Sequence, residues 1–307
     1  MKRKIQLISL LTVLLCMSIG SAQQSPQYTQ YMYNMNVINP AYAGSEGTLN
    51  IGVLYRTQWV GFEGAPKTVT ASINAPVGRN VGLGFTAIAD EIGPVKEQNI
   101  FADFSYTIKT SDIGRLAFGI KGGATFQRID FNSMTAVEEE DYLIDRNNVN
   151  NIYPNVGVGI FYYGERFYTG FSIPNMLETL HFEKKDGMIS NACEKMHYFF
   201  TTGYVFDVSE NLKLKPSLFA KAAMGAPVSI DVSFNALINE KLEFGLSYRL
   251  DDSVSAIVSL FVQSNFRIGY AYDYTISNFS NYNSGTHEIM LHYNVDNSRQ
   301  GKSPRFF

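Results

Sequence analysis

The residues Ile230-Asp231-Val232-Ser233-Phe234-Asn235-Ala236-Leu237-Ile238 decide the fold, because apolar and polar side chains alternate along most of them. The same alternation returns in residues 242–250, 266–274 and 289–295. A period of two predicts β-strands that present one face to an apolar environment and the other to a polar one. Each run is about ten residues long, which is the length that a tilted strand needs to cross the hydrocarbon of a membrane.

A less regular form of this alternation extends upstream to Leu49 and predicts about fourteen strands. An even number is typical of single-chain bacterial outer-membrane barrels. Short turns and mostly longer loops alternate between the strands, and in such barrels the short turns face the periplasm. Both ends of the chain are therefore expected on the periplasmic side. The strands are expected at residues 49–59, 67–76, 80–90, 97–109, 114–129, 152–163, 165–173, 196–208, 211–222, 227–238, 241–250, 253–263, 265–275 and 286–295.

Composition agrees with a membrane protein that crosses the bilayer with strands. Aromatic residues make up 14% of the chain and charged residues only 17%, whereas a soluble domain has about 25% charged residues. After residue 22 no stretch approaches the ~18 consecutive apolar residues of a spanning helix. We therefore predict an all-β fold, a transmembrane antiparallel β-barrel of about 14 strands, located in the outer membrane. A soluble β-sandwich that buries the same apolar face is the alternative.

The first 22 residues have the three parts of a secretory signal peptide. A basic start, Met1 to Lys4, precedes the apolar residues 5–19, and small residues at 20–22 suit cleavage. The predicted division of the chain is a signal peptide at 1–22, an N-terminal plug or periplasmic segment at 23–48, the transmembrane barrel at 49–295 and a C-terminal tail at 296–307.

Residues 23–48 do not follow the strand pattern. Aromatic and methionine side chains recur there at helical spacing, and Asn39-Pro40 ends any helix. The segment is too short and polar to cross a membrane, so we expect it to fold into the lumen as a plug or to cap the periplasmic mouth. A flexible leader is the alternative. The candidate plug residues are Tyr28, Tyr31, Met32, Met35, Asn39, Pro40 and Tyr42.

Charged residues on the strands are expected to point into the lumen, where their mixed signs favour ion pairs between neighbouring strands over an ion filter of one sign. These residues are Asp103, Lys121, Arg128, Lys213, Lys215, Asp231, Glu243, Arg249, Arg267 and Asp273.

The sequence offers little for catalysis or metal binding. The four histidines show no HExxH spacing, and only Cys193 would remain after signal cleavage. The acidic run at 138–141 lacks EF-hand spacing and is expected to be a solvated loop. No Gly-x-Ser-x-Gly turn is present, and a net charge of −3 without a basic stripe argues against nucleic acid. We therefore predict no enzyme activity, no catalytic residues, no metal and no cofactor.

Two long outside loops, at 130–151 and 174–195, carry apolar side chains that have no core of their own to enter. Such side chains are candidate anchors for a partner protein. The candidate contact residues are Tyr142, Leu143, Ile144, Met176, Leu177 and Phe182.

The N-terminal third contains a succession of motifs that resembles the PorP/SprF family of type IX secretion system membrane proteins. Gln30-Tyr31-Met32-Tyr33-Asn34 is followed by Asn39-Pro40-Ala41-Tyr42-Ala43-Gly44, and the first strand carries Tyr55-Arg56-Thr57-Gln58-Trp59. Further on come Pro66-Lys67-Thr68 and Gly82-Leu83-Gly84, and the chain closes with Pro304-Arg305-Phe306-Phe307. The likeness runs from about Gln27 to the C-terminus.

The resemblance implies a role in the secretion or anchoring of surface proteins, including adhesins used in gliding, through their C-terminal sorting domains. It also implies contact with periplasmic components of the secretion machinery, alongside outer-membrane lipid. The family has no catalytic residues to carry over. The alternative function is a porin or a channel for hydrophobic solutes, which would need an open, hydrated lumen.

Overall fold

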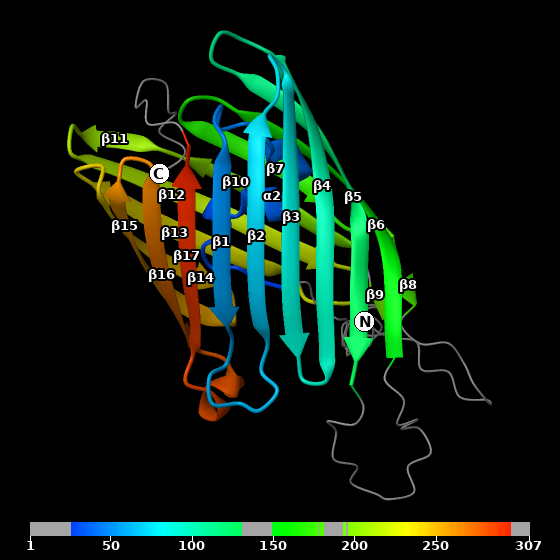
Figure 1. The fold of residues 1–307 in the computed structure, drawn as a ribbon. Coiled ribbons are helices and arrows are strands. Elements are labelled where there is room, and N and C mark those ends of the chain that lie inside the picture. The colour runs from blue at the N-terminus through cyan, green and yellow to red at the C-terminus, as the bar shows by residue number, and fades with distance from the viewer. Residues whose placement is uncertain (1–25, 131–148, 178, 181–192, 195, 296–307) are drawn as a thin grey trace, which may run out of the picture.

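The computed structural model describes residues 26–130, 149–177, 179–180, 193–194 and 196–295 of the chain. The strands form one closed antiparallel barrel, shown in Figure 1 with its axis roughly vertical. Within the described residues no helix has the length and apolar character that are needed to cross a membrane.

Consecutive strands pair with their neighbours around the barrel, and β8 with β9 forms a separate two-stranded hairpin. The barrel strands are β1 (Asn50–Thr57), β2 (Lys67–Pro76), β3 (Val81–Ile92), β4 (Val95–Lys109), β5 (Arg115–Ile129), β6 (Val149–Tyr163), β7 (Phe167–Ile173), β10 (His197–Tyr204), β11 (Phe206–Ser209), β12 (Leu212–Ala223), β13 (Ser229–Ile238), β14 (Leu242–Arg249), β15 (Ser253–Gln263), β16 (Phe266–Thr275) and β17 (Thr286–Asn294). The hairpin strands are β8 (Thr179–Leu180) and β9 (Cys193–Glu194).

The barrel closes where the first strand meets the last. β1 pairs with β17 along its whole length, from Asn50 opposite Asn294 to Thr57 opposite His287. Closure leaves no open sheet edge between these strands, as a hydrocarbon surrounding requires, because backbone groups there find no water to bond.

β10 and β11 are two parts of one barrel strand, because both pair with β12. Their ladder is interrupted between Gly203, which lies opposite Ser217, and Phe206, which lies opposite Leu214. Pro216 lies within this gap and has no backbone N–H to donate to a neighbouring strand. Counted as one, the pair completes fourteen strands, so the predicted barrel and its strand number are confirmed, with strand ends within about three residues of the predicted ones.

The barrel has a turn end and a loop end. The turn end carries the short connections at 77–80, 110–114, 164–166, 210–211, 239–241 and 264–265. The loop end carries the connections at 58–66, 93–94, 130–148, 174–196, 224–228, 250–252 and 276–285. In Figure 1 β1 runs downward from the turn end to the loop end. By the rule for outer-membrane barrels the turn end is expected to face the periplasm.

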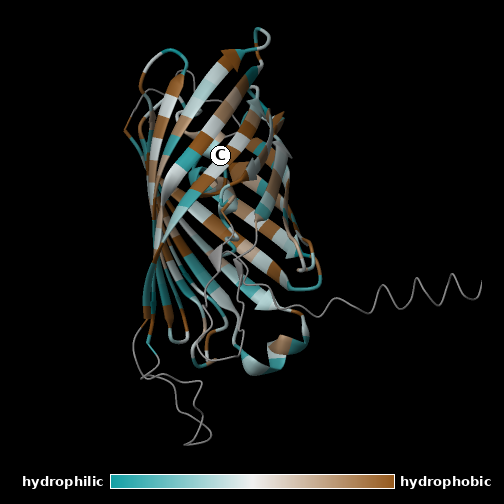
Figure 2. Ribbon diagram, turned by 90° about the vertical axis from the view of Figure 1, so that its right-hand side faces the viewer, coloured by the Kyte–Doolittle hydropathy of each residue, from teal (hydrophilic) through white to brown (hydrophobic). Residues whose placement is uncertain are grey.

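Side chains alternate between the lipid face and the lumen, and Figure 2 shows the resulting bands of hydropathy along the strands. In β14, for example, Phe244, Leu246 and Tyr248 are exposed on the outside, whereas Glu243 and Arg249 are buried inside. Eight of the ten charged residues expected in the lumen are buried there. Lys213 is half-buried on the same face of its strand as Lys215.

Arg128 was wrongly expected in the lumen. The pairing of β4 with β5 runs without a bulge from Arg115 to Ile129. Because side chains alternate strictly along such a strand, Arg128 lies between the inward-facing Gln127 and Ile129 and points outward. Lys121 and Arg128 are an odd number of residues apart, so they cannot share a face of an unbroken strand.

Candidate functional site: the filled lumen and the loop end

Residues 26–48, called here the N-terminal segment, pass through the lumen from one end of the barrel to the other. Near the loop end, the Gln27 side chain donates to Ser229 Oγ at the start of β13 (2.9 Å). The first described residues therefore lie at the end expected to face the outside, and for them the expectation of a periplasmic position was wrong. Near the turn end, the backbone N–H of Gly44 donates to Asn74 Oδ1 (3.2 Å), and the Ser105 hydroxyl donates to the Ala43 carbonyl (2.6 Å). The segment then leads directly into β1.

The segment is a chain of three short helical turns, η1 (Tyr31–Tyr33), α2 (Met35–Ile38) and η2 (Pro40–Tyr42). Asn39 begins the third turn, because its Oδ1 accepts a hydrogen bond from the backbone N–H of Ala41 (3.0 Å). Pro40 suits the first position of the turn, where its missing N–H leaves nothing unpaired. The Asn39 amide also donates to the Ile160 carbonyl of β6 (3.1 Å), so this residue holds the segment to the wall.

Apolar side chains of the segment pack on aromatic rings that the barrel wall directs inward. The rings of Tyr31 and Phe219 stack with centroids 4.7 Å apart, and Tyr42 meets the edge of Phe161 at 5.4 Å. The cluster is completed by Tyr28, Met32, Met35, Val37, Ile38 and Ala41 from the segment and by Leu54, Ala117, Tyr163, Tyr168, Phe199 and Met290 from the wall. Burial of this apolar surface favours the lumenal position of the segment.

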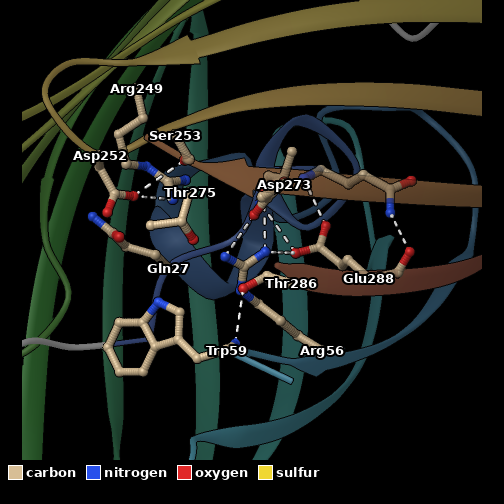
Figure 3. A network of polar contacts seen from close by, with 12 residues as sticks. Gln27, Arg56, Trp59, Arg249, Asp252, Ser253, Asp273, Thr275, Thr286 and Glu288 are labelled. Atoms are coloured by element: carbon tan, nitrogen blue, oxygen red, sulfur yellow. Dashed lines mark hydrogen bonds and ion pairs between the residues drawn. The ribbon is translucent and has the colours of Figure 1, made fainter. Parts of the chain in front are cut away.

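A buried cluster of charges holds the part of the segment nearest the loop end (Figure 3). The guanidinium of Arg56 lies 2.8 Å from Asp273 and 3.0 Å from Glu288, and all three residues are buried. Glu288 also accepts hydrogen bonds from the backbone N–H groups of Thr29 (3.0 Å) and Gln30 (2.7 Å). One ion-pair network therefore joins the segment to strands β1, β16 and β17.

A second polar group lies across the lumen, on β4 and β5. The ammonium of Lys121 is 3.5 Å from the Asp103 carboxylate and donates to the Val37 carbonyl of the segment (3.0 Å). Asp103 in turn accepts from the Asn36 side chain (3.0 Å). A third contact, from the Tyr33 hydroxyl to Glu243, ties the segment to β14.

Glycines in the wall give the segment backbone room to approach the strands. A Cβ on Gly119 would lie 2.1 Å from the backbone nitrogen of Ala41, and one on Gly82 would lie 2.0 Å from the Ala43 carbonyl oxygen. Neither distance is compatible with a side chain, so the Asn-Pro-Ala-Tyr-Ala-Gly stretch fits only against bare backbone at these positions. Gly44 itself has φ of +72°, which favours glycine.

All seven candidate plug residues lie in the lumen and are buried: Tyr28, Tyr31, Met32, Met35, Asn39, Pro40 and Tyr42. Their role in closing the barrel to solutes stays a prediction. Of the candidate contact residues, Met176 and Leu177 follow β7 at the loop end and are 37% and 40% exposed. Tyr142, Leu143, Ile144 and Phe182 lie outside the described residues.

The loop end also carries an aromatic lobe that was not expected from the sequence: Trp59, Phe62, Phe279 and Tyr282. The Phe279 ring, in η4 (Asn278–Tyr282), lies 4.9 Å from that of Trp59 and 5.2 Å from that of Phe62. Backbone hydrogen bonds between Val60 and residues 284–285 join the two loops that form it. Phe62 and Tyr282 remain 46% and 67% exposed. In the sequence, the aromatic residues of the loops at 58–66 and 276–285 were the feature that could have predicted this lobe.

In the part of the chain that the structure describes, no three or more His, Cys, Asp or Glu side chains are grouped so that they could hold a metal ion. The charged side chains around Arg56 and around Lys121 instead bond to one another within each cluster and to the N-terminal segment. The barrel can therefore hold the N-terminal segment in its lumen and present binding surfaces at the turn end and the loop end.

The sequence matches the family model described as type IX secretion system membrane protein PorP/SprF over residues 20–293. No curated protein matches the chain.

Solved structures with a similar fold include three bacterial proteins, each 9% identical in sequence. Acinetobacter baumannii outer membrane protein Omp33 has a TM-score of 0.46 over 80% of this chain and 95% of that chain. The Ralstonia pickettii toluene transporter TbuX has a TM-score of 0.49 over 84% and 92%. A Pseudomonas aeruginosa FadL homologue has a TM-score of 0.43 over 81% and 89%.

Proposed function

Because this chain belongs to the PorP/SprF family of type IX secretion system membrane proteins, we propose that it holds secreted surface proteins at the outer membrane. It is an outer-membrane β-barrel of a secretion system, a protein class distinct from known enzymes. The proposed clients are surface proteins such as adhesins, including those used in gliding, and they are held through their C-terminal sorting domains.

The observation that carries this proposal is the filled lumen. The N-terminal segment contacts the wall on several sides, through Arg56 and Glu288, through Lys121 and Asp103, and through apolar packing. A lumen occupied in this way is suited to binding at the ends of the barrel, whereas a porin needs a continuous aqueous path.

The loop end supplies the proposed client surface. Phe62 and Tyr282 of the aromatic lobe and the half-exposed Met176 and Leu177 are apolar side chains on the side expected to face the outside. Aromatic side chains are frequent anchors in protein interfaces. We propose that the client contact includes this lobe together with Tyr142, Leu143, Ile144 and Phe182 of the two long loops. A stable contact would cover about 800 Å² on each partner.

The turn end supplies the proposed contact with periplasmic components of the secretion machinery. Exposed apolar residues mark its short connections, among them Val77 and Ile113, which are 56% and 70% exposed. These residues lie in the connections between strands.

Gentle detergent extraction of the barrel from its native outer membrane, followed by mass spectrometry of co-purifying proteins, tests the proposal. We expect recovery of a large surface protein that remains bound through its C-terminal domain after limited proteolysis. Recovery of the barrel alone, together with a steady ion conductance, would contradict the proposal and favour the porin or hydrophobic-solute channel.

A further inference from the structure

A cavity of about 270 Å³ lies beside the N-terminal segment, toward the loop end. Its walls come from β3, β4, β5, β6, β10 and β12 and from the segment itself. Most of the wall is apolar, with Ile88, Phe101, Phe199 and Phe219 among its side chains.

Two carboxylates face each other across neighbouring strands in the cavity wall. Asp90 of β3 and Glu97 of β4 are directly opposite in the strand register, and both line the cavity. Like charges in directly opposite positions destabilise a sheet. One position further on, where the side chains point outward, Glu91 and Lys96 form an ion pair of 3.1 Å.

Neutral groups are the hydrogen-bond partners of both carboxylates. The Thr68 hydroxyl donates to Asp90, and the Gln127 side-chain amide donates to Glu97 (2.8 Å). Among the described residues, neither Asp90 nor Glu97 forms an ion pair. The basic residue of the cavity wall is Lys121, and its ammonium is bound to Asp103 and to the carbonyls of Asn36 and Val37. Within the part of the chain that the structure describes, the two carboxylates therefore have no cation paired with them.

Two further polar atoms in the same wall lack partners. Asn155 Oδ1 and the Tyr28 hydroxyl oxygen are buried and have no hydrogen-bond partner in the described structure, although only 6% and 4% of these residues is exposed. A buried polar atom without a hydrogen-bond partner is destabilising, so a ligand that donates hydrogen bonds would stabilise this site.

We propose that the cavity binds a primary ammonium or guanidinium group carried on a short apolar stem. Such a group has several N–H donors and no acceptor, which complements Asp90, Glu97 and Asn155 Oδ1. Its positive charge compensates the two carboxylates, and the side chains of Phe101, Phe199 and Phe219 give the stem an apolar wall. The ligand is either a small free amine or a lysine or arginine side chain of a protein segment inserted from the loop end.

Isothermal titration of the full-length barrel in detergent with benzylammonium tests this proposal, and benzyl alcohol and benzoate serve as neutral and anionic analogues of the same size. We expect saturable binding of benzylammonium alone. The double variant Asp90→Asn/Glu97→Gln should bind it at least tenfold more weakly. The matched control is Glu91→Gln, next to Asp90 but pointing outward, which should bind as the unaltered protein does.

Compact migration of each unheated variant on a denaturing gel reports that the barrel is folded. Equal binding of benzyl alcohol, or an equal loss in Glu91→Gln, would overturn the proposal. So would binding of Ca²⁺ that depends on Asp90 and Glu97 in the absence of any benzylammonium binding.

Competition distinguishes the two sources of the amine. An extended lysine-containing peptide that displaces benzylammonium, when the same peptide with norleucine does not, supports a protein side chain. Displacement by small amines alone supports a free amine. The result is independent of co-purification with a surface protein, so failure here leaves the proposed function standing, and the reverse also holds.

Discussion

Arg56 of the first strand and Glu288 of the last strand lie opposite each other in the register that closes the barrel, with the guanidinium 3.0 Å from the carboxylate. The same carboxylate accepts hydrogen bonds from the Thr29 and Gln30 backbone. One buried ion pair, further supported by Asp273, therefore contributes both to barrel closure and to the position of the N-terminal segment.

Replacement of Arg56 by methionine should strongly destabilise the barrel. It leaves Asp273 and Glu288 buried without their cation, and loss of one partner of a buried ion pair costs about 3–5 kcal/mol. Urea unfolding in lipid vesicles measures the change. Lys109→Met, which breaks an exposed ion pair with Asp112, is the control and should leave the unfolding midpoint unchanged. Equal midpoints for both variants would contradict a structural role for Arg56.

Gly119→Val should displace the N-terminal segment from the wall, because any Cβ at this position overlaps the Ala41 backbone. Gly122→Val on the same strand is the control, since a Cβ at Gly122 has no neighbour within 4 Å. Chymotrypsin should cut Gly119→Val after the tyrosines of the segment much faster than it cuts the control. Equal protection of the segment in both variants would show that Gly119 does not hold it.

Asn39→Ala should loosen the third helical turn of the segment. The variant loses the hydrogen bond from Ala41 and the one to the Ile160 carbonyl, and a lost N-terminal cap costs about 1–2 kcal/mol. Amide hydrogen exchange of residues 41–44 measures the effect and should become faster there. The exposed Asn80→Ala at the turn end is the matched control. Unchanged exchange in Asn39→Ala would mean that packing alone fixes the turn.

The double variant Phe62→Ser/Tyr282→Ser should reduce recovery of the surface protein by at least tenfold, because it removes the two exposed rings of the aromatic lobe. Quantitative mass spectrometry after native extraction measures the recovery. Ile113→Ser, an equally apolar change at the turn end, should leave client recovery unchanged. If the turn-end variant lost the client and the lobe variant kept it, the client surface would lie at the other end.

The strands were predictable because two solvents impose the pattern. Lipid outside and a polar lumen inside force alternate residues to differ, as in residues 242–250, and strand number and position follow from that alternation. The interruption of a strand was harder to predict from the sequence than the strands themselves. The interruption near Val205 depends on Pro216, which lies eleven residues away in the sequence and beside it in space.

The contacts of the lumen were not predictable, because alternation gives the face of a residue and not its partner. Lys121 could be expected inside, yet its bonds to Asp103 and to the Val37 carbonyl depend on the path of the N-terminal segment. Likewise Asp90 and Glu97 attract attention only once the strand register sets them opposite each other. The aromatic lobe was missed because its two loops are more than 200 residues apart and meet only through barrel closure.

Ion conductance in a planar lipid bilayer tests most directly the central claim that the N-terminal segment closes the lumen. The full-length barrel is compared with a variant lacking residues 26–44. We expect no steady conductance from the full-length barrel and a large, steady conductance from the shortened variant. A large conductance that is the same in both would contradict the claim and identify the protein as an open channel.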